Sequence, residues 1–148
     1  MDREQGFSLI EVLIAMLVIG LLAAIAIPTL LGQQGKAHDS SAKEAVNRVA
    51  KEVETCRVEH SSYAACDEKD ELEGAPDIDW GQDPGQAGVL KEMTSTDSYV
   101  AYAVSTAKTN GKNHVYAWMK DASGVTKRLC VDTSLAALNA GGCSGGTW

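Results

Sequence analysis

The sequence predicts an α+β fold in which one long N-terminal helix packs on a small antiparallel sheet of three to four strands. Three observations predict this class. A long uncharged apolar run comes first, a helical apolar stripe follows it, and the last third of the chain holds segments rich in the β-branched and aromatic residues that strands favour. We expect a short polar segment (1–6), a helix (7–58), a connecting loop (59–97) and the sheet (98–148).

The composition bounds the function. The chain has 148 residues, 45% of them apolar, and a formal net charge of −7, which suits one folded domain. The 5% aromatic content and the negative charge argue against a surface on which nucleic-acid bases stack. Nucleic acid is therefore not indicated as a partner, although the composition does not exclude it. The four cysteines form no C-x-x-C pair, which favours two disulfides in an oxidising compartment over a zinc or redox motif.

The apolar half of the helix covers residues 7–31, and these 25 residues are enough to span a bilayer. A single carboxylate, Glu11, lies one turn inside this segment, where an unpaired charge is costly and needs a partner. Pro28 removes a backbone donor near the other end, and Gly20 adds conformational freedom. We therefore expect weakened helical restraint over residues 21–27.

Two ordinary interpretations compete for this apolar segment: a secretory signal peptide and a plain membrane anchor. The tripeptide that ends at Ala26 fits an A-x-A cleavage site, and cleavage there would release a soluble, secreted binding domain. Against this interpretation, the residues ahead of the apolar run have no net basic charge, and Glu11 lies at the edge of the run.

The amphipathic half of the helix covers residues 32–58. Its apolar residues recur at spacings of three and four along one face: Ala42, Val46, Val49, Val53 and Cys56. We expect this stripe to pack on the sheet, because it is too short for a separate coiled coil. If the helix is broken near Gly35, Asp39 and the two serines after it supply residues for a new helix start.

The connecting loop, residues 59–97, is strongly acidic. Residues 67–83 hold eight acidic residues and one basic residue, a net of −7, whereas residues 98–148 hold five basic and two acidic residues, a net of +3. Two interpretations stay open: ordinary solvated surfaces, or a complementary contact between neighbouring copies that uses bases such as Lys120 and Lys127. Trp80 is expected to pin the loop to the body of the protein.

Three segments rich in β-branched and aromatic residues predict strands over 98–107, 113–120 and 125–132. Asn110-Gly111 and Ser123-Gly124 lie between them as turns. Strands joined in this way form an antiparallel meander, and one of its faces is free to cover the amphipathic helix.

No enzymatic activity, cofactor or metal is predicted. Residues 142–146 fit G-x-S-x-G, but a nucleophile elbow also needs a preceding strand, a following helix and a downstream acid and histidine. The acidic loop lacks the D-x-D-x-D-G pattern of a calcium site. His38, His60 and His114 are far apart in sequence, so each is expected to face solvent or to cap a helix.

A glycine, an aromatic residue and a glutamate stand in fixed register ahead of the apolar run, in Gly6-Phe7-Ser8-Leu9-Ile10-Glu11. Together with Gly20 and Pro28, this segment resembles the N-terminus of type IV prepilins over about the first 35 residues. The resemblance implies that residues 1–6 are a leader, that a prepilin peptidase cuts between Gly6 and Phe7, and that Phe7 is then N-methylated. The leader is charge-balanced here, whereas leaders of this family are usually basic.

The resemblance also implies a function. The chain would be a single-pass precursor in the cytoplasmic membrane with its C-terminal domain outside, and pilus assembly machinery would then polymerise it into an extracellular homopolymeric helical filament. In the filament, Glu11 of one copy would meet the Phe7 amine of a neighbour and neutralise both buried charges. The stretch between Gly20 and Pro28 would lose helix on assembly, as it does in related filaments. A type II secretion pseudopilin shares these N-terminal features and is the main alternative.

Adhesion, twitching motility and DNA uptake are all activities of the family, and the sequence does not choose among them, nor between a major and a minor pilin. Four cysteines allow three pairings. We favour Cys56 with Cys66, which clips the helix end to the loop, and Cys130 with Cys143, which closes a loop after the last strand. The second pair resembles the disulfide-bounded C-terminal loop of type IV pilins.

Overall fold

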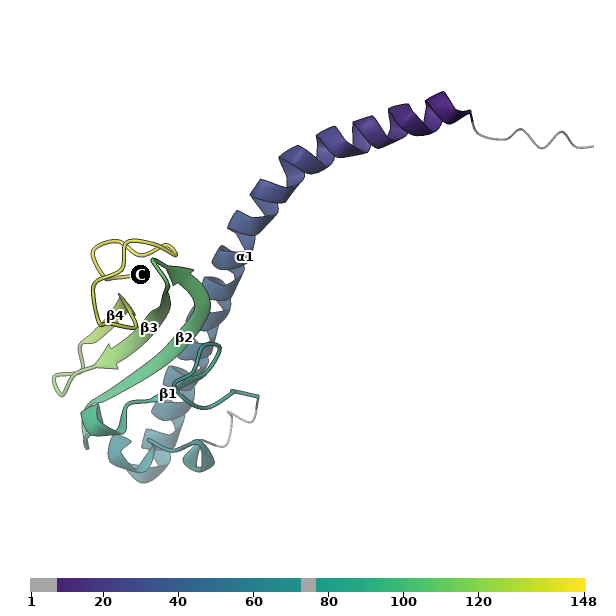
Figure 1. Cartoon of the computed structure of the whole chain (residues 1–148). Helices are drawn as coiled ribbons and strands as arrows, with labels where there is room; N and C mark the ends of the chain where they lie inside the picture. Colours follow the sequence, from purple (N-terminus) through teal and green to yellow (C-terminus); the bar gives the residue numbers. More distant parts are fainter. Residues whose placement is uncertain (1–7, 73–76) are drawn as a thin grey trace, which may run out of the picture. The chain divides into compact units, whose positions relative to one another are not determined.

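The structure, a computed structural model, describes residues 8–72 and 77–148, apart from the side chains of residues 28, 29, 31 and 32. It comprises two compact units, one that ends at Gln34 and one that spans Gly35–Trp148. The helix α1, Leu9–His60, contributes its first half to the first unit and its second half to the second unit. Figure 1 shows its second half beside the sheet.

Helix α1 is continuous over 52 residues. It has no break near Gly35, so Asp39 lies inside the helix and caps no new start. Ser41 sits in the same turn and donates its hydroxyl to the carbonyl oxygen of Ala37, 3.1 Å away, a bond that leaves the helix intact. The helix ends at His60 because Ser61 takes the left-handed conformation, with φ of 57°, which stops a helix.

The second unit contains one antiparallel sheet of four strands in the order β1-β2-β3-β4. The strands are β1 (Ala87–Val89), β2 (Tyr99–Thr109), β3 (Lys112–Lys120) and β4 (Thr126–Asp132). The α+β class and the antiparallel meander are therefore confirmed. Strand β1 lies within the predicted loop and was not foreseen as a strand, because three residues show no periodicity.

The connection between β2 and β3 is the predicted Asn-Gly turn. Asn110 and Gly111 both have positive φ, 53° and 79°, as a two-residue hairpin turn requires. In its described residues, 59–72 and 77–97, the acidic loop carries three short 3₁₀ helices: η1 (Tyr63–Ala65), η2 (Lys69–Glu71) and η3 (Lys91–Met93). Trp80 is half-buried against the core and bridges to Ala87, so it holds the loop in place as expected.

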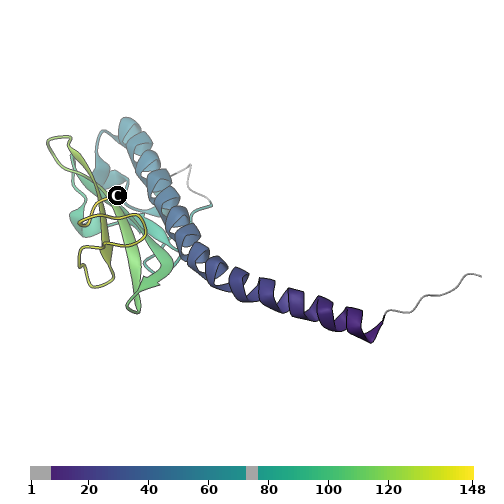
Figure 2. The same ribbon diagram turned by 90° about the horizontal axis from the view of Figure 1, so that it is seen from above.

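The core lies between α1 and one face of the sheet (Figure 2). All five residues of the predicted stripe are buried: Ala42, Val46, Val49, Val53 and Cys56. Opposite them lie Tyr99, Ala101, Ala103 and Tyr116, which are also buried. This confirms that the stripe packs on the sheet and forms no separate coiled coil.

Val46→Ala should lower the free energy of unfolding by about 2 kcal/mol, because it removes two methyl groups from a closed core and leaves a cavity. Val58→Ala is the matched control, since Val58 is on the same helix but 84% exposed, and it should change stability by less than about 0.5 kcal/mol. Denaturant unfolding of the full chain in detergent micelles measures both. Equal effects for the two variants would contradict the helix–sheet packing described here.

Candidate assembly site

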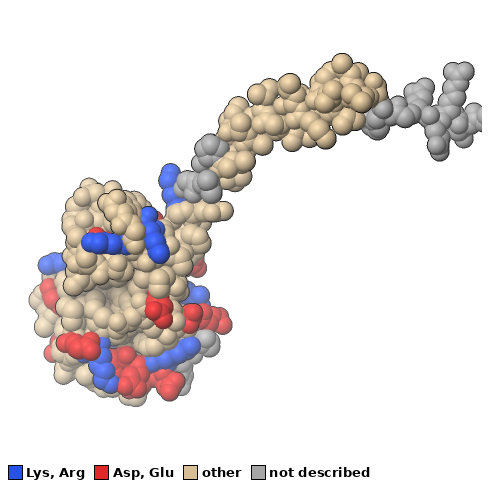
Figure 3. All heavy atoms as spheres, in the orientation of Figure 1, with Lys and Arg blue, Asp and Glu red and all other residues tan. Residues whose placement is uncertain are grey.

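The first unit exposes apolar side chains on every side of α1. Each large apolar side chain described between Leu9 and Leu30 is exposed, with fractions from 41% to 78%. The span Leu9–Ile27 is long and apolar enough to cross a membrane, with a mean hydropathy of 2.8. Figure 3 shows the drawn face of this unit without a charged side chain. A helix that is apolar all round needs lipid or neighbouring chains around it.

Glu11 lies in the first turn of α1, where the helix dipole favours a negative charge. Its backbone N–H donates to the carbonyl oxygen of Ser8 at 3.0 Å. Its side chain is exposed, and no ion pair reaches it from residues 8–72 or 77–148. Gly6 and Phe7 lie outside the described residues, so the cleavage and methylation assigned to them stay predictions.

Gly20 and Pro28 both lie within the unbroken helix. A Cβ atom at Gly20 would meet nothing within 4 Å, so this glycine is not required by packing within one chain. The loss of helix between these two residues concerns assembled copies, and it also stays a prediction.

A first polar cluster ties α1 to the far end of the sheet. The carboxylate of Glu54 accepts hydrogen bonds from Lys120 Nζ at 2.9 and 3.0 Å, from the Tyr63 hydroxyl at 2.9 Å and from the Tyr99 hydroxyl at 3.1 Å. Burial by itself would raise the pKa of Glu54, but the bonds from Lys120 and the tyrosines outweigh it and lower that pKa. Lys120 is therefore paired within its own chain, and its part in contacts between copies stays a prediction.

A second polar cluster ties α1 to the other end of β3. His114 is buried, and its Nδ1 lies 2.9 Å from Asp39 Oδ1 while its Nε2 lies 2.8 Å from Thr109 Oγ1. The expectation that His114 faces solvent was wrong, because strand alternation turns it toward α1. His38 and His60 are exposed as expected.

The sequence did contain a signal for this second cluster. Asp39 precedes Ala42 by three residues, so it extends the helical stripe by one position. His114, Tyr116, Trp118 and Lys120 alternate along β3 and so share one face of the sheet. Asp39 stands at the start of the helical stripe, and His114 stands at the start of the β3 face that packs on it. Two polar residues placed in this way predict a buried pair.

Two disulfides stabilise the second unit. Cys56 is bonded to Cys66, with Cα atoms 5.9 Å apart, and Cys130 to Cys143, with Cα atoms 6.4 Å apart. Both loops are short, and each bond contributes about 3 kcal/mol on a chain-entropy account. The loop closed by the second bond is also fixed through Gly141, whose carbonyl oxygen accepts from Lys43 Nζ at 2.8 Å and the Tyr116 hydroxyl at 3.2 Å.

The acidic stretch is partly neutralised within its own chain. Lys91 Nζ lies 2.6 Å from a Glu68 carboxylate oxygen, and Arg48 lies 3.8 Å from Asp77. On the second unit Figure 3 shows acidic and basic side chains close together. Part of the charge on this stretch is therefore balanced within one chain, and a charge-complementary contact between copies stays a prediction.

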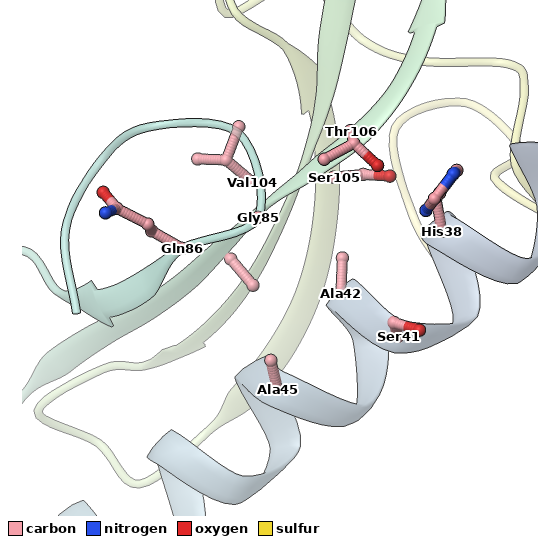
Figure 4. A pocket seen from close by; sticks show the side chains of 10 residues that line it. His38, Ser41, Ala42, Ala45, Gly85, Gln86, Val104, Ser105 and Thr106 are labelled. Atoms are coloured by element: carbon pink, nitrogen blue, oxygen red, sulfur yellow. The ribbon is translucent and has the colours of Figure 1, made fainter. Parts of the chain in front are cut away.

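A shallow hollow of about 140 Å³ lies between α1, β2 and the turn at Gly85 (Figure 4). Small side chains line most of it, and His38 is the one histidine among its lining residues. Within residues 8–72 and 77–148, no three His, Cys, Asp or Glu side chains are grouped as metal ligands.

Comparison with known proteins agrees with these features. Residues 1–27 match the prokaryotic N-terminal methylation motif. The Type IV wide pilus major component PilA4 of Thermus thermophilus is 35% identical over 65 residues, 44% of this chain and 50% of that protein. The Fimbrial protein of Moraxella nonliquefaciens is 33% identical over 96 residues, 65% and 60% of the two chains. The Type II secretion system core protein G of Vibrio cholerae is 28% identical over 68 residues, 46% and 47%.

The methylation motif, the exposed apolar helix and the sheet-bearing second unit define a pilin-like protein. The chain carries the N-terminal methylation motif and is similar both to type IV pilins and to type II secretion pseudopilins. These relatives are structural proteins, which agrees with the prediction that the chain is not an enzyme. The chain spans about half the length of the curated relatives it matches, and no solved structure matches it significantly.

Glu54→Gln should make stability less dependent on acid pH. The folded state lowers the pKa of Glu54 from its ordinary value of about 4.3. The stabilisation is therefore complete above that value and is lost as the pH falls through the lower folded value. The free energy of unfolding, measured by denaturant between pH 7 and pH 3, should fall less steeply in the variant. Glu44→Gln, an exposed change on the same helix, should keep the parental slope, and an equal slope in both variants would contradict the assignment.

Proposed function

We propose that the chain is a structural subunit of a type IV pilus. A membrane-inserted precursor is cut between Gly6 and Phe7, methylated at Phe7 and polymerised through its apolar helix into a surface filament. The observation that carries this proposal is the helix from Leu9 to Leu30, which is exposed and apolar on all sides and begins inside a methylation motif. Neighbouring helices in a filament would cover that surface after it leaves the lipid.

Glu11 gives this assembly its register. Cleavage after Gly6 leaves a cationic amine on Phe7, four residues before Glu11. Both charges enter an apolar bundle, where each is costly alone and tolerable as a pair. Apolar side chains pack in many registers, whereas a carboxylate and an amine on neighbouring copies are satisfied in few. The pair therefore selects one axial offset among otherwise unspecific contacts.

A pseudopilin of type II secretion is the second candidate, and the similarity to core protein G supports it. The two candidates differ in how the second unit is stabilised. Two short disulfide loops favour the pilus subunit, whereas a strict calcium requirement for folding would favour the pseudopilin. Unfolding temperatures of the full chain with excess calcium and with a calcium chelator separate the two.

The mature protein from its native host should begin at N-methylated Phe7. Intact mass and N-terminal sequencing of sheared surface filaments measure this directly. A start at Ile27 would mean cleavage after Ala26 and a secreted soluble domain, and the filament mechanism would then be wrong. An unprocessed start at Met1 would indicate a plain membrane anchor.

Glu11→Ala should leave the precursor inserted in the membrane but reduce sheared filaments at least tenfold, because the Phe7 amine of each copy then enters the bundle unpaired. Immunoblots of membrane and sheared fractions measure the ratio. Glu44→Ala removes a carboxylate from the exposed face of the same helix and should leave the ratio unchanged. Normal filament amounts in the Glu11 variant would refute the pairing.

A further inference from the structure

Two turns, one at each end of β4, have the same hydrogen-bond pattern. In the first, Asp121 accepts at its carbonyl oxygen from Gly124 N–H at 2.9 Å and donates its own N–H to Val125 at 3.0 Å. In the second, Asp132 accepts from Leu135 N–H at 2.8 Å and donates to Ala136 at 2.9 Å.

The aspartate side chains are used alike as well. Asp121 Oδ1 accepts from the backbone N–H groups of Ser123 and Val125, each at 3.0 Å. Asp132 Oδ1 accepts from Ser134 N–H at 2.7 Å and Ala136 N–H at 3.2 Å. In both turns a serine hydroxyl also donates to the same oxygen. The two turns are therefore the same structural motif at two positions.

The motifs differ at the one residue that must be left-handed. Gly124 takes φ of 83°, which is free for glycine, whereas Leu135 takes φ of 64°. This position of a three-residue hairpin loop normally holds glycine, because a Cβ atom makes the left-handed conformation unfavourable. The leucine recovers little of this cost inside its own chain, since it is 81% exposed. An exposed residue held in an unfavourable backbone conformation points to a role in contacts with another molecule.

Exposed apolar residues lie at both ends of the second unit. Among its described large apolar side chains, four are exposed: Val58, Met93, Val125 and Leu135. The turn of Leu135 lies near the start of β3, because Lys112 Nζ donates to Ser134 Oγ at 2.7 Å.

The other three lie near the opposite end of β3, at Lys120. Val58 follows Glu54, which binds Lys120. Met93 precedes the start of β2, where Tyr99 pairs with Lys120, and Val125 closes the turn that begins at Asp121. Strand β4 separates the two ends by about 20 Å, given its seven residues.

We propose that Leu135 is the anchor of a head-to-tail contact between copies, in which it packs against the apolar end surface of the next copy, formed by Val58, Met93 and Val125. This inference rests on the proposed function, because the filament brings copies together. One end offers a single apolar side chain on a hydrogen-bonded turn and the other offers several, so the surfaces differ and the contact is heterologous. Heterologous contacts that do not close produce helical filaments rather than dimers.

A second copy is the occupant that fits best. The same chain carries both surfaces, at opposite ends of one folded unit. The charges left after local pairing also differ in net sign. Near the Leu135 end Lys112 is paired with Asp132, and Lys108 is exposed. Near the other end Lys91 and Arg57 are paired with Glu68 and Asp97, and the acidic residues Glu59, Glu92 and Asp121 outnumber Lys127. Opposite charges around an apolar contact favour the head-to-tail pairing over a symmetric one.

Leu135→Gly in the full-length chain, expressed in its native host, tests the proposal. Glycine suits the left-handed turn, so the unfolding temperature should stay the same or rise. The ratio of sheared filament to membrane-held subunit should fall about tenfold, the scale expected for one lost leucine contact per interface. Leu135→Asn, which also tolerates the turn, should behave alike. Ala136→Ser, an exposed change at the next residue, is the matched control and should leave both quantities unchanged.

A combined Val58→Ser, Met93→Ser and Val125→Ser variant tests the other side of the contact. It should reduce filaments to a similar extent, and adding Leu135→Gly to it should cause little further loss, because the two sides form one interaction. Additive losses would overturn the proposal. Normal filaments in Leu135→Gly would overturn it as well, and methylated Phe7 in those filaments would show that the proposed pilus function still stands. Normal filaments with impaired attachment to a surface would assign Leu135 to a different partner.

Discussion

The packing of one stripe of α1 on the sheet is the interaction on which the second unit depends. Val46, Val49 and Val53 are fully buried in this contact, and each contributes roughly 1.5–3 kcal/mol by leaving water. The same helix lacks any such cover over its first half, where all large apolar side chains described between Leu9 and Leu30 are exposed. One helix is thus built for two environments: a sheet of its own chain for the second half, and lipid or other chains for the first.

Polar pairs at the two ends of this contact fix how the helix lies along the sheet. Asp39 bonds to His114 near the start of β3, and Glu54 bonds to Lys120 at its end. A slide of α1 by one turn, about 5.4 Å, would separate both pairs and leave a buried carboxylate without its partner. Apolar contacts alone tolerate such slides, so the pairs contribute specificity more than stability. In our proposal Glu11 acts in the same way between chains, because a carboxylate in an apolar bundle meets a charged partner at only a few axial offsets.

Sequence patterns predicted those features that repeat along the chain. The stripe from Ala42 to Cys56 has the helical period, and the main strands are seven or more residues long and rich in β-branched and aromatic residues, so both stand out. Strand β1 is too short to show a period, and it exists because β2 offers it an edge. The sequence of either segment alone does not predict the buried pair of Asp39 and His114. The pair becomes predictable only when the helical stripe and the alternating face of β3 are aligned with each other. Leu135 is ordinary in sequence, and only its backbone conformation and exposure set it apart.

Three features of the isolated chain carry a free-energy cost that its own residues do not offset. These features are an apolar helix without cover, a carboxylate inside the N-terminal methylation motif, and a strained exposed leucine. A neighbouring chain would lower the free-energy cost of each, whereas water would not. In the filament that we propose, their roles would differ. Apolar helix packing would supply most of the area but little direction, Glu11 would select an axial offset, and a heterologous contact through Leu135 would distinguish head from tail. A filament needs all three, because area without direction gives aggregates, and direction without area gives contacts too weak to persist.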